Sequence, residues 1–284
     1  MKIIKTTDEM RSLALEEKIG EKKIACVPTM GFLHEGHLSL IKRAKQVADV
    51  VVVTLFVNPT QFSPNEDFAQ YPRDLQRDSE LCLKAGADYL FAPSPEEIYP
   101  AGYNTGVVVK GVSELFEGKF RPIHFNGVAT VVAKMFNIIR PDFAVFGQKD
   151  YQQTLVVKQM VRDLLLGVEI IVAPIIRENS GLAKSSRNTY LSDEQKTQAL
   201  VLSRSLKLAT DAIAAGETKS AYINKILHDN IEKSAFSKID YACAARAKDL
   251  TEPEEFAHGE EVVLLLAAYL GKVRLIDNCL VTIK

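Results

Sequence analysis

The first half of the chain alternates short apolar runs with amphipathic stretches, and this order constrains the fold most strongly. Val50–Leu55 is a continuous run rich in β-branched residues, as expected for a strand covered on both faces. Leu75–Ala85 has apolar residues at helical spacing and is followed by Gly86, a residue favoured just past a helix end. This βαβα order predicts an α/β fold, a Rossmann-like doubly wound parallel sheet with ligands at the carboxyl ends of its strands.

The same patterns predict the other elements of this part of the chain. The expected strands are Lys23–Val27, Val50–Phe56, Tyr89–Ala92, Thr105–Val109, Phe143–Phe146 and Glu169–Pro174. The expected helices are Leu38–Ala48, Leu75–Ala85, Val128–Ile139 and Tyr151–Leu165. Each helix therefore joins two strands, as a parallel sheet requires.

The pattern changes near Asn188 and predicts a second, smaller domain. Ser192–Gln195 has the spacing of a helix-capping segment, and Gly216 marks the expected end of that helix. A second helix over about Lys219–Ser234 precedes strand-like runs, two of which are joined by Leu270-Gly271-Lys272, a sequence suited to a tight hairpin. These runs are Ile239–Ala245, Val262–Ala268 and Val273–Ile276. We therefore expect a larger domain over residues 1–187 and a smaller C-terminal α+β domain over residues 188–284.

Composition narrows the class of protein. The chain has 284 residues, of which 47% are hydrophobic and 25% charged, enough for a sizeable core in one large or two ordinary domains. The formal net charge of −1 argues against an electrostatic nucleic-acid binder. The four scattered cysteines favour reduced thiols in a cytoplasmic protein, and we expect neither a signal peptide nor a membrane partner.

Two histidines, His34 and His37, stand where a predicted strand gives way to a predicted helix. Residues at i and i+3 share one face of a helix, and its first turn presents free backbone N–H groups. Such a face is suited to phosphate oxygens, and Gly36 lets a ligand approach the backbone. A metal site is a weaker alternative because no third ligand is apparent nearby and the two-histidine zinc motif has i, i+4 spacing. The other alternative is that the two histidines simply stand at the solvated start of a helix.

Two further strand ends carry polar side chains. Asn58 and Gln61 follow the second predicted strand, and their amides suit a substrate with hydroxyl and carboxylate groups, although Asn-Pro also makes a simple turn. Lys149 is a cation at a helix start where phosphate would bind, and Gln153 follows one helical turn later. Asp150 could cap that helix or bind a ribose hydroxyl or Mg²⁺.

Lys184-Ser185-Ser186-Arg187, after Gly181, is polar and cationic at both ends and lies near the predicted domain boundary. A mobile loop of this kind can close over a triphosphate, with hydroxyl and backbone donors. The alternative is an interdomain linker, which would have no evident need for two cations around two serines.

Taken in order, these segments resemble pantoate–β-alanine ligases (pantothenate synthetases) of the nucleotidyltransferase superfamily. Pro28–His37 is similar to the HIGH motif of that superfamily, and Lys184–Arg187 is similar to its KMSKS loop. Further segments match the family in order and spacing: Phe56–Phe62, Tyr71–Asp74, Arg121–Val128 and Phe146–Gln153. The resemblance covers nearly the whole chain and is weakest after about residue 190.

The resemblance implies a reaction. (R)-Pantoate and β-alanine would condense at the expense of ATP to give pantothenate, AMP and diphosphate, through an enzyme-bound pantoyl adenylate. Residues 1–187 would bind ATP and pantoate, and residues 188–284 would act as a lid. The resemblance also implies a homodimer, with Mg²⁺ carried mainly by the ATP phosphates rather than by protein ligands.

It also implies roles for individual residues. His37 would be the proton donor, with His34, Lys149 and Arg187 as further catalytic groups. Gln61 would hold pantoate and β-alanine, Gln153 would hold pantoate, and Asn58 would be a further substrate-binding residue. The residues implied to bind ATP are Met30, Gly31, Phe32, Leu33, His34, Glu35, Gly36, His37, Gly147, Gln148, Lys149, Asp150, Ile176, Lys184, Ser185, Ser186 and Arg187.

Two other functions fit part of the pattern. A superfamily enzyme that adenylylates a phosphate would be expected to carry extra basic residues around its second substrate, in place of two glutamines and an asparagine. A non-catalytic nucleotide sensor would not need both histidines, Lys149 and the Lys184–Arg187 loop together. Turnover measured beside binding separates these alternatives.

Overall fold

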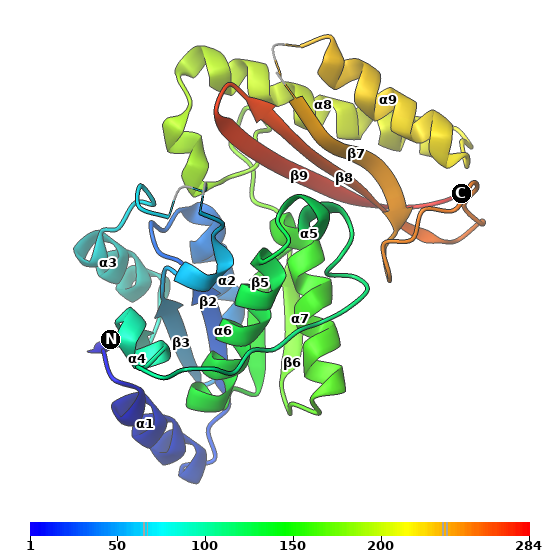
Figure 1. The fold of residues 1–284 in the computed structure, drawn as a ribbon. Helices are drawn as coiled ribbons and strands as arrows, with labels where there is room; N and C mark the ends of the chain where they lie inside the picture. The colour runs from blue at the N-terminus through cyan, green and yellow to red at the C-terminus, as the bar shows by residue number, and fades with distance from the viewer. Residues whose placement is uncertain (65, 67, 235, 237) are drawn as a thin grey trace. The chain divides into compact units, whose positions relative to one another are not determined.

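The computed structural model describes residues 1–64, 66, 68–234, 236 and 238–284, and the chain divides into two compact units (Figure 1). The first comprises Met1–Gln148 and Gln152–Pro174, and the second comprises Lys149–Tyr151 and Ile175–Lys284. The division after Pro174 falls earlier than the predicted boundary between residues 187 and 188. The reason is packing, because Leu182 lies in the core of the second unit and Arg177 forms a backbone bridge with Ala183 there.

The first unit is built on a six-stranded sheet whose paired strands are all parallel, which confirms the predicted fold class. The strand order is β1-β4-β3-β2-β5-β6. The bounds are β1 Lys2–Ile4, β2 Ile24–Thr29, β3 Val50–Leu55, β4 Tyr89–Phe91, β5 Phe143–Gly147 and β6 Glu169–Ala173. The sequence order runs from β2 outward to β4 on one side and from β5 to β6 on the other, so the direction reverses between β2 and β5.

The predicted strand Thr105–Val109 is wrong, because residues 103–110 form no regular element. The backbone N–H of Val107 donates to Thr130 Oγ1 of helix α6 (His124–Ile139) at 2.9 Å, so this segment lies along a helix. The remaining strand of the sheet is β1, whose three residues are too short to give a periodic signal.

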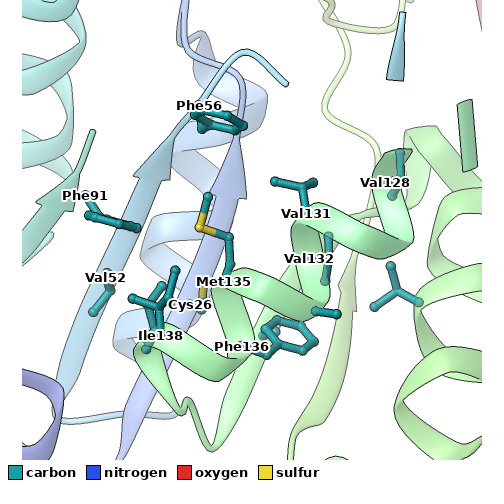
Figure 2. Close-up of a cluster of buried hydrophobic side chains, with 14 of the residues drawn as sticks. Cys26, Val52, Phe56, Phe91, Val128, Val131, Val132, Met135, Phe136 and Ile138 are labelled. Atoms are coloured by element: carbon teal, nitrogen blue, oxygen red, sulfur yellow. The ribbon is translucent and has the colours of Figure 1, made fainter. Parts of the chain in front are cut away.

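Helices cover both faces of this sheet. The remaining helices of the unit are α1 Thr7–Ile19, α2 Glu35–Lys45, α3 Leu75–Ala85, α4 Pro95–Ile98, α5 Phe116–Phe120 and the 3-10 helix η1 Pro59–Gln61, with α7 Tyr151–Asp163 from Gln152 onward. The 3-10 helix η2 Gln148–Asp150 begins in this unit, and its last two residues belong to the second. Alternate residues of a strand point to opposite faces. Cys26 and Val52 accordingly pack with α6, where Figure 2 shows Met135 and Ile138 beside them. Their neighbours along β2 and β3, such as Val27, enter a separate core with α2 and α3.

The second unit contains an antiparallel sheet of β7 Lys238–Arg246, β8 Glu261–Leu270 and β9 Val273–Thr282, in that order. Its helices are α8 Asp193–Ala214 and α9 Ser220–Glu232, after the 3-10 helix η3 Ser186–Tyr190. Ser192 and Gln195 form the predicted capping box of α8. Apolar residues of both helices, such as Leu206 and Leu227, share one core with β8. The predicted α+β composition is confirmed.

Among the described residues, no helix has the length and apolar character needed to cross a membrane. All four cysteines are free thiols, and Cys26, Cys82 and Cys243 are buried.

Candidate functional site

The parallel sheet brings several predicted segments to one edge. In open parallel sheets, ligands bind outside the carboxyl ends of the strands, where the strand order reverses. Here that point lies between β2 and β5. The segment with His34 and His37 follows β2, the segment with Asn58 and Gln61 follows the adjacent β3, and Gly147 ends β5.

The two histidines form the cap of α2. His34 is the N-cap residue, and its Nδ1 accepts a hydrogen bond from the Gly36 backbone N–H at 3.1 Å. His37 Nδ1 accepts from the His34 backbone N–H at 3.3 Å, which completes a reciprocal capping box. The ring centroids lie 4.1 Å apart. Capping thus accounts for the i, i+3 spacing and fixes both rings at the start of the helix.

This cap also fixes the tautomer of each imidazole. A backbone N–H can only donate, so both Nδ1 atoms must be acceptors. In a neutral ring the proton then lies on Nε2. Each histidine is therefore set up to donate through Nε2, as a group that stabilises phosphate oxygens requires.

The loop before this cap is held by the first turn of α3. Gly31 and Phe32 have φ of +86° and +50°, a region that costs energy for a residue such as Phe. Asp78 accepts hydrogen bonds from the backbone N–H groups of Phe32, at 2.6 Å, and of Leu33, at 2.8 Å. Arg77 Nη2 donates to the Leu33 carbonyl oxygen at 2.8 Å, and its guanidinium lies 4.8 Å from the Phe32 ring centroid. The loop is thus clamped through both its donors and an acceptor.

Sequence reasoning missed Asp78, although a signal was present. Asp78 lies four residues before the buried Cys82, so the two share a face of α3. A carboxylate on an apolar helix face needs buried partners. Burial raises the pKa of the Asp78 carboxyl, although the hydrogen bonds from Leu33 and Phe32 oppose the shift.

We expect Asp78→Asn to loosen this loop. An amide presents one acceptor oxygen, so one of the two backbone N–H groups would lose its partner, at a cost of about 1–3 kcal/mol in unfolding free energy. If the loop binds ATP, the Kd for ATP should rise about tenfold or more, a change that calorimetry would measure. Asp74→Ala is the matched control because Asp74 caps the same helix through the Arg77 backbone N–H at 3.0 Å. An ATP affinity unchanged in Asp78→Asn would contradict a role for the clamp.

Asn58 lies in a network that orients Gln61. Its side chain is buried, and Nδ2 donates to Gln61 Oε1 at 3.2 Å and to the Gly127 carbonyl oxygen at 3.0 Å. Its Oδ1 accepts from the Tyr99 hydroxyl at 2.8 Å. Both amide hydrogens of Asn58 are thus used within the protein. Gln61 Nε2 donates to Met30 Sδ at 2.8 Å, and a thioether is a weak acceptor that a carboxylate or hydroxyl can replace.

The predicted segment Arg121–Val128 supports this network from the side of α6. A Cβ on Gly127 would lie 2.5 Å from the Thr60 carbonyl oxygen, so the close approach of α6 to η1 requires glycine. His124 Nδ1 lies 3.1 Å from the Gln61 carbonyl oxygen. Burial and the nearby Arg121 lower the pKa of His124 to about 4, so this imidazole is neutral near pH 7. The segment therefore positions Gln61.

The start of α7 holds two glutamines with different surroundings. Gln153, the predicted substrate ligand, is half-buried. Its neighbour Gln152 is buried, and its Nε2 donates to the carbonyl oxygens of Val112 and Leu115 at 2.7 and 2.8 Å. Gln152 thus holds the segment before α5, a structural role that nothing in its sequence position indicated.

The remaining cationic segments belong to the second unit. Lys149 and the exposed Asp150 lie in the short piece Lys149–Tyr151, whereas Gly147 and Gln148 stay with the first unit. The Lys184–Arg187 loop is anchored at one end by a hydrogen bond from the Lys184 N–H to the Ile176 carbonyl oxygen at 2.9 Å. Ser185 Oγ accepts from the Arg187 N–H at 3.3 Å and starts η3. The segment is therefore a folded turn, unlike an extended linker.

The described residues contain no cluster of three or more His, Cys, Asp or Glu side chains able to hold a metal ion. The two histidines cap a helix where the strand order of the parallel sheet reverses, and amide side chains follow the next strand. This arrangement defines the class as a ligand-binding α/β enzyme with donors suited to phosphate.

The sequence matches the family described as Pantoate-beta-alanine ligase over residues 2–280. The chain belongs to this family, which confirms the resemblance.

Individual relatives support the assignment. The pantothenate synthetase of Moorella thermoacetica is 51% identical over 98% of both chains, and that of Caldicellulosiruptor bescii is 49% identical over 100% of both. A pantothenate synthetase structure from Thermus thermophilus aligns with a TM-score of 0.91 at 42% identity, covering 98% of this chain and 99% of the other. A Francisella tularensis pantoate-beta-alanine ligase, described as complexed with beta-gamma ATP and beta-alanine, aligns with a TM-score of 0.80 at 37% identity, covering 99% and 97%.

Proposed function

We propose that this chain condenses (R)-pantoate with β-alanine at the expense of ATP, giving pantothenate, AMP and diphosphate through a pantoyl adenylate. Family membership over nearly the whole chain supports the overall reaction. The adenylate and the residue roles rest on the site. The observation that carries them is the cap of α2, in which both histidines accept through Nδ1 and so present Nε2 as the donor.

In the first step, a pantoate carboxylate oxygen attacks the α-phosphorus of ATP. A new P–O bond forms, the bond from the α-phosphorus to the bridging oxygen breaks, and diphosphate leaves. Negative charge builds on the phosphate oxygens, so donors fixed in advance lower the barrier. By analogy with the family, His37 is the proton donor; with Nδ1 accepting, it acts by donating an Nε2–H hydrogen bond to the phosphate oxygens and keeps its proton. His34, Lys149 and Arg187 stabilise the charge.

Pantoate is held by amide side chains. Gln61 donates through Nε2 to the substrate in place of the Met30 thioether, while Asn58 fixes its Oε1. This assigns Asn58 an indirect part in substrate binding. Gln153 is the second pantoate ligand, and Gln61 also meets β-alanine.

In the second step, the β-alanine amine attacks the acyl carbon of the adenylate. A C–N bond forms, the acyl C–O bond breaks, AMP leaves and the nitrogen loses a proton. An acyl adenylate hydrolyses readily, so exclusion of water is needed. The smaller domain and the Lys184–Arg187 loop act as the lid.

ATP enters with Mg²⁺, a cation usually bound by substrate phosphates together with one or two carboxylates. No dedicated protein cage is required for this mode of binding. The remaining ATP-binding roles fall to the backbone of Met30–His37, to Gly147–Asp150, Ile176 and the Lys184–Arg187 loop. The family resemblance further implies a cytoplasmic homodimer, and analytical ultracentrifugation would test its oligomeric state.

Incubation with ATP and Mg²⁺ tests the proposal. We expect diphosphate release to require pantoate and to stop near one equivalent per site without β-alanine, because AMP stays in the bound adenylate. With β-alanine present, AMP and diphosphate should both be released continuously. Binding of ATP without any AMP release would favour a nucleotide sensor. Nucleotide transfer to a phosphorylated acceptor, with none to pantoate, would favour the rival superfamily enzyme.

We expect Gln61→Ala to weaken pantoate binding selectively. Loss of the Nε2 donor leaves a substrate oxygen unpaired in a buried site, which costs about 1–3 kcal/mol of binding free energy. ATP affinity should barely change because Gln61 lies on the loop after β3 and the phosphate-binding cap follows β2. Calorimetry with each ligand measures both values. An equal loss of ATP affinity would contradict this assignment of the loop.

A further inference from the structure

Two adjacent buried side chains of β9, Asp277 and Asn278, reach two segments that are far apart in the sequence. Asn278 Nδ2 donates to the Lys149 carbonyl oxygen at 2.9 Å. The Asp277 carboxylate accepts from both terminal nitrogens of Arg177, Nη1 at 2.7 Å and Nη2 at 2.9 Å. Asp277 and Asn278 are 3% and 2% exposed, respectively, and the contacts are internal to the second unit.

The Lys149 segment is tied to the second unit at both ends. Besides the bond from Asn278, the Tyr151 hydroxyl donates to the Ala247 carbonyl oxygen at 2.8 Å. This explains why Lys149–Tyr151 groups with the second unit although β5, which precedes it, belongs to the first. The position of the Lys149 backbone is therefore set by β9.

Arg177 connects Asp277 to the turn that precedes the Lys184–Arg187 loop. Arg177 Nη1 also donates to the Gly181 carbonyl oxygen at 3.1 Å, and its backbone forms a bridge with Ala183. Gly181 has φ of +100°, a conformation that favours glycine in a tight turn. A bidentate arginine–carboxylate pair is strongly directional, so this turn is held in one geometry. The cationic loop begins where the turn ends.

We propose that Asp277 and Asn278 are positioning residues that hold Lys149 and the Lys184–Arg187 loop as one rigid set of cations for the ATP phosphates. The inference rests on the proposed function. It adds a role for two residues that the sequence motifs do not contain. Charge stabilisation demands that donors be held close to their productive positions, and a misplacement of about 1 Å can cost about 100-fold in rate.

Double-mutant cycles test the positioning role. Asn278→Ala should slow single-turnover adenylate formation by about 10- to 100-fold. In a Lys149→Ala background the same change should have no further effect, because a residue that acts through another shows non-additive loss. Asp277→Asn, an isosteric change, should slow adenylate formation similarly in the wild type and should have no further effect in an Arg187→Ala background. If Asn278→Ala slows the Lys149→Ala enzyme by the same factor as the wild type, the proposal is overturned.

The sheet offers a matched control. The side chain of Asp240 on β7 is 1% exposed and pairs with Arg274 Nε of β9 at 2.7 Å, so Asp240→Asn weakens another ion pair of the same sheet. We expect this variant to melt at a lower temperature without loss of adenylate formation. A loss of rate equal to that of Asp277→Asn would mean that both act through general destabilisation, and the proposal would fail.

Hydrogen exchange of the ligand-free protein separates this inference from the proposed function. Asn278→Ala should speed exchange of the backbone amides of residues 149–151, and Asp277→Asn should speed exchange of residues 181–187. Unchanged exchange there would overturn the inference even in a fully active enzyme. A wild-type protein that releases no pantoate-dependent AMP would instead overturn the proposed function, and the exchange rates would still decide whether β9 fixes these segments.

Discussion

Replacement of His37 by Ala is expected to slow adenylate formation by about 10²–10³, the usual cost of removing one donor aimed at developing charge. The capping box adds a second effect. Loss of the Nδ1 acceptor leaves the His34 backbone N–H without its partner, which should cost about 1 kcal/mol of unfolding free energy and lower the melting temperature by about 2–4 °C. Rapid-quench kinetics and calorimetry measure the two effects separately.

His37→Gln separates the cap from the chemistry. Glutamine is a standard residue at this position of a capping box and can accept from the same backbone N–H. We expect it to restore the melting temperature while adenylate formation stays well below that of the parent. A His37→Ala enzyme within a few-fold of the parent rate would remove His37 from the mechanism.

Arg187→Ala is expected to reduce adenylate formation by about 10²–10³ while the Kd for ATP changes only a few-fold. An interaction made only in the transition state lowers kcat without weakening ground-state binding. Arg187→Lys should recover part of the rate, because lysine keeps the charge but not the planar fork. Single-turnover kinetics and equilibrium titration with ATP measure these two quantities. Arg162→Ala is the control, since the Arg162 side chain is 73% exposed on α7 and has no proposed role.

Limited trypsinolysis tests the lid independently. If the loop closes over ATP, cleavage after Lys184 should slow when ATP is bound, because closure orders an accessible segment. A rise in the ATP Kd of Arg187→Ala equal to its loss of rate would identify the loop as a ground-state clamp. In that case the lid proposal would be wrong.

The parallel sheet could be predicted because its strands carry strong local signals. The β-branched run of β3 and the spacing of α3 each suffice for an assignment, and α3 has the predicted bounds Leu75–Ala85. The three-residue β1 and the extended segment around Val107 could not be distinguished, because strand pairing depends on partners distant in the sequence. The division after Pro174 differs from the predicted boundary, and the pairing of Arg177 with Asp277 within the second unit is likewise a tertiary contact without a local sequence signal.

The candidate site shows the same division. His34, His37 and Gln61 were predicted from residue type and position, and the fold places them after the ends of the neighbouring strands β2 and β3. The contacts of Asp78 with the Phe32 backbone and of Asn278 with the Lys149 backbone could not be predicted, since each joins segments far apart in the sequence. Asn58 was assigned to the substrate by its chemistry, yet its amide hydrogens are used to orient Gln61 and α6. Sequence pattern thus indicates which groups carry chemistry, while the folded chain reveals which groups position them.

The central claim is attack of the pantoate carboxylate on the α-phosphorus of ATP, and isotope transfer tests it most directly. Pantoate labelled with ¹⁸O in both carboxylate oxygens is turned over with ATP, Mg²⁺ and β-alanine, and the masses of the products are measured by mass spectrometry. The pantoyl adenylate route places one ¹⁸O atom in AMP and leaves one in the amide carbonyl of pantothenate. Unlabelled AMP, or label in inorganic phosphate with ADP as the product, would contradict it.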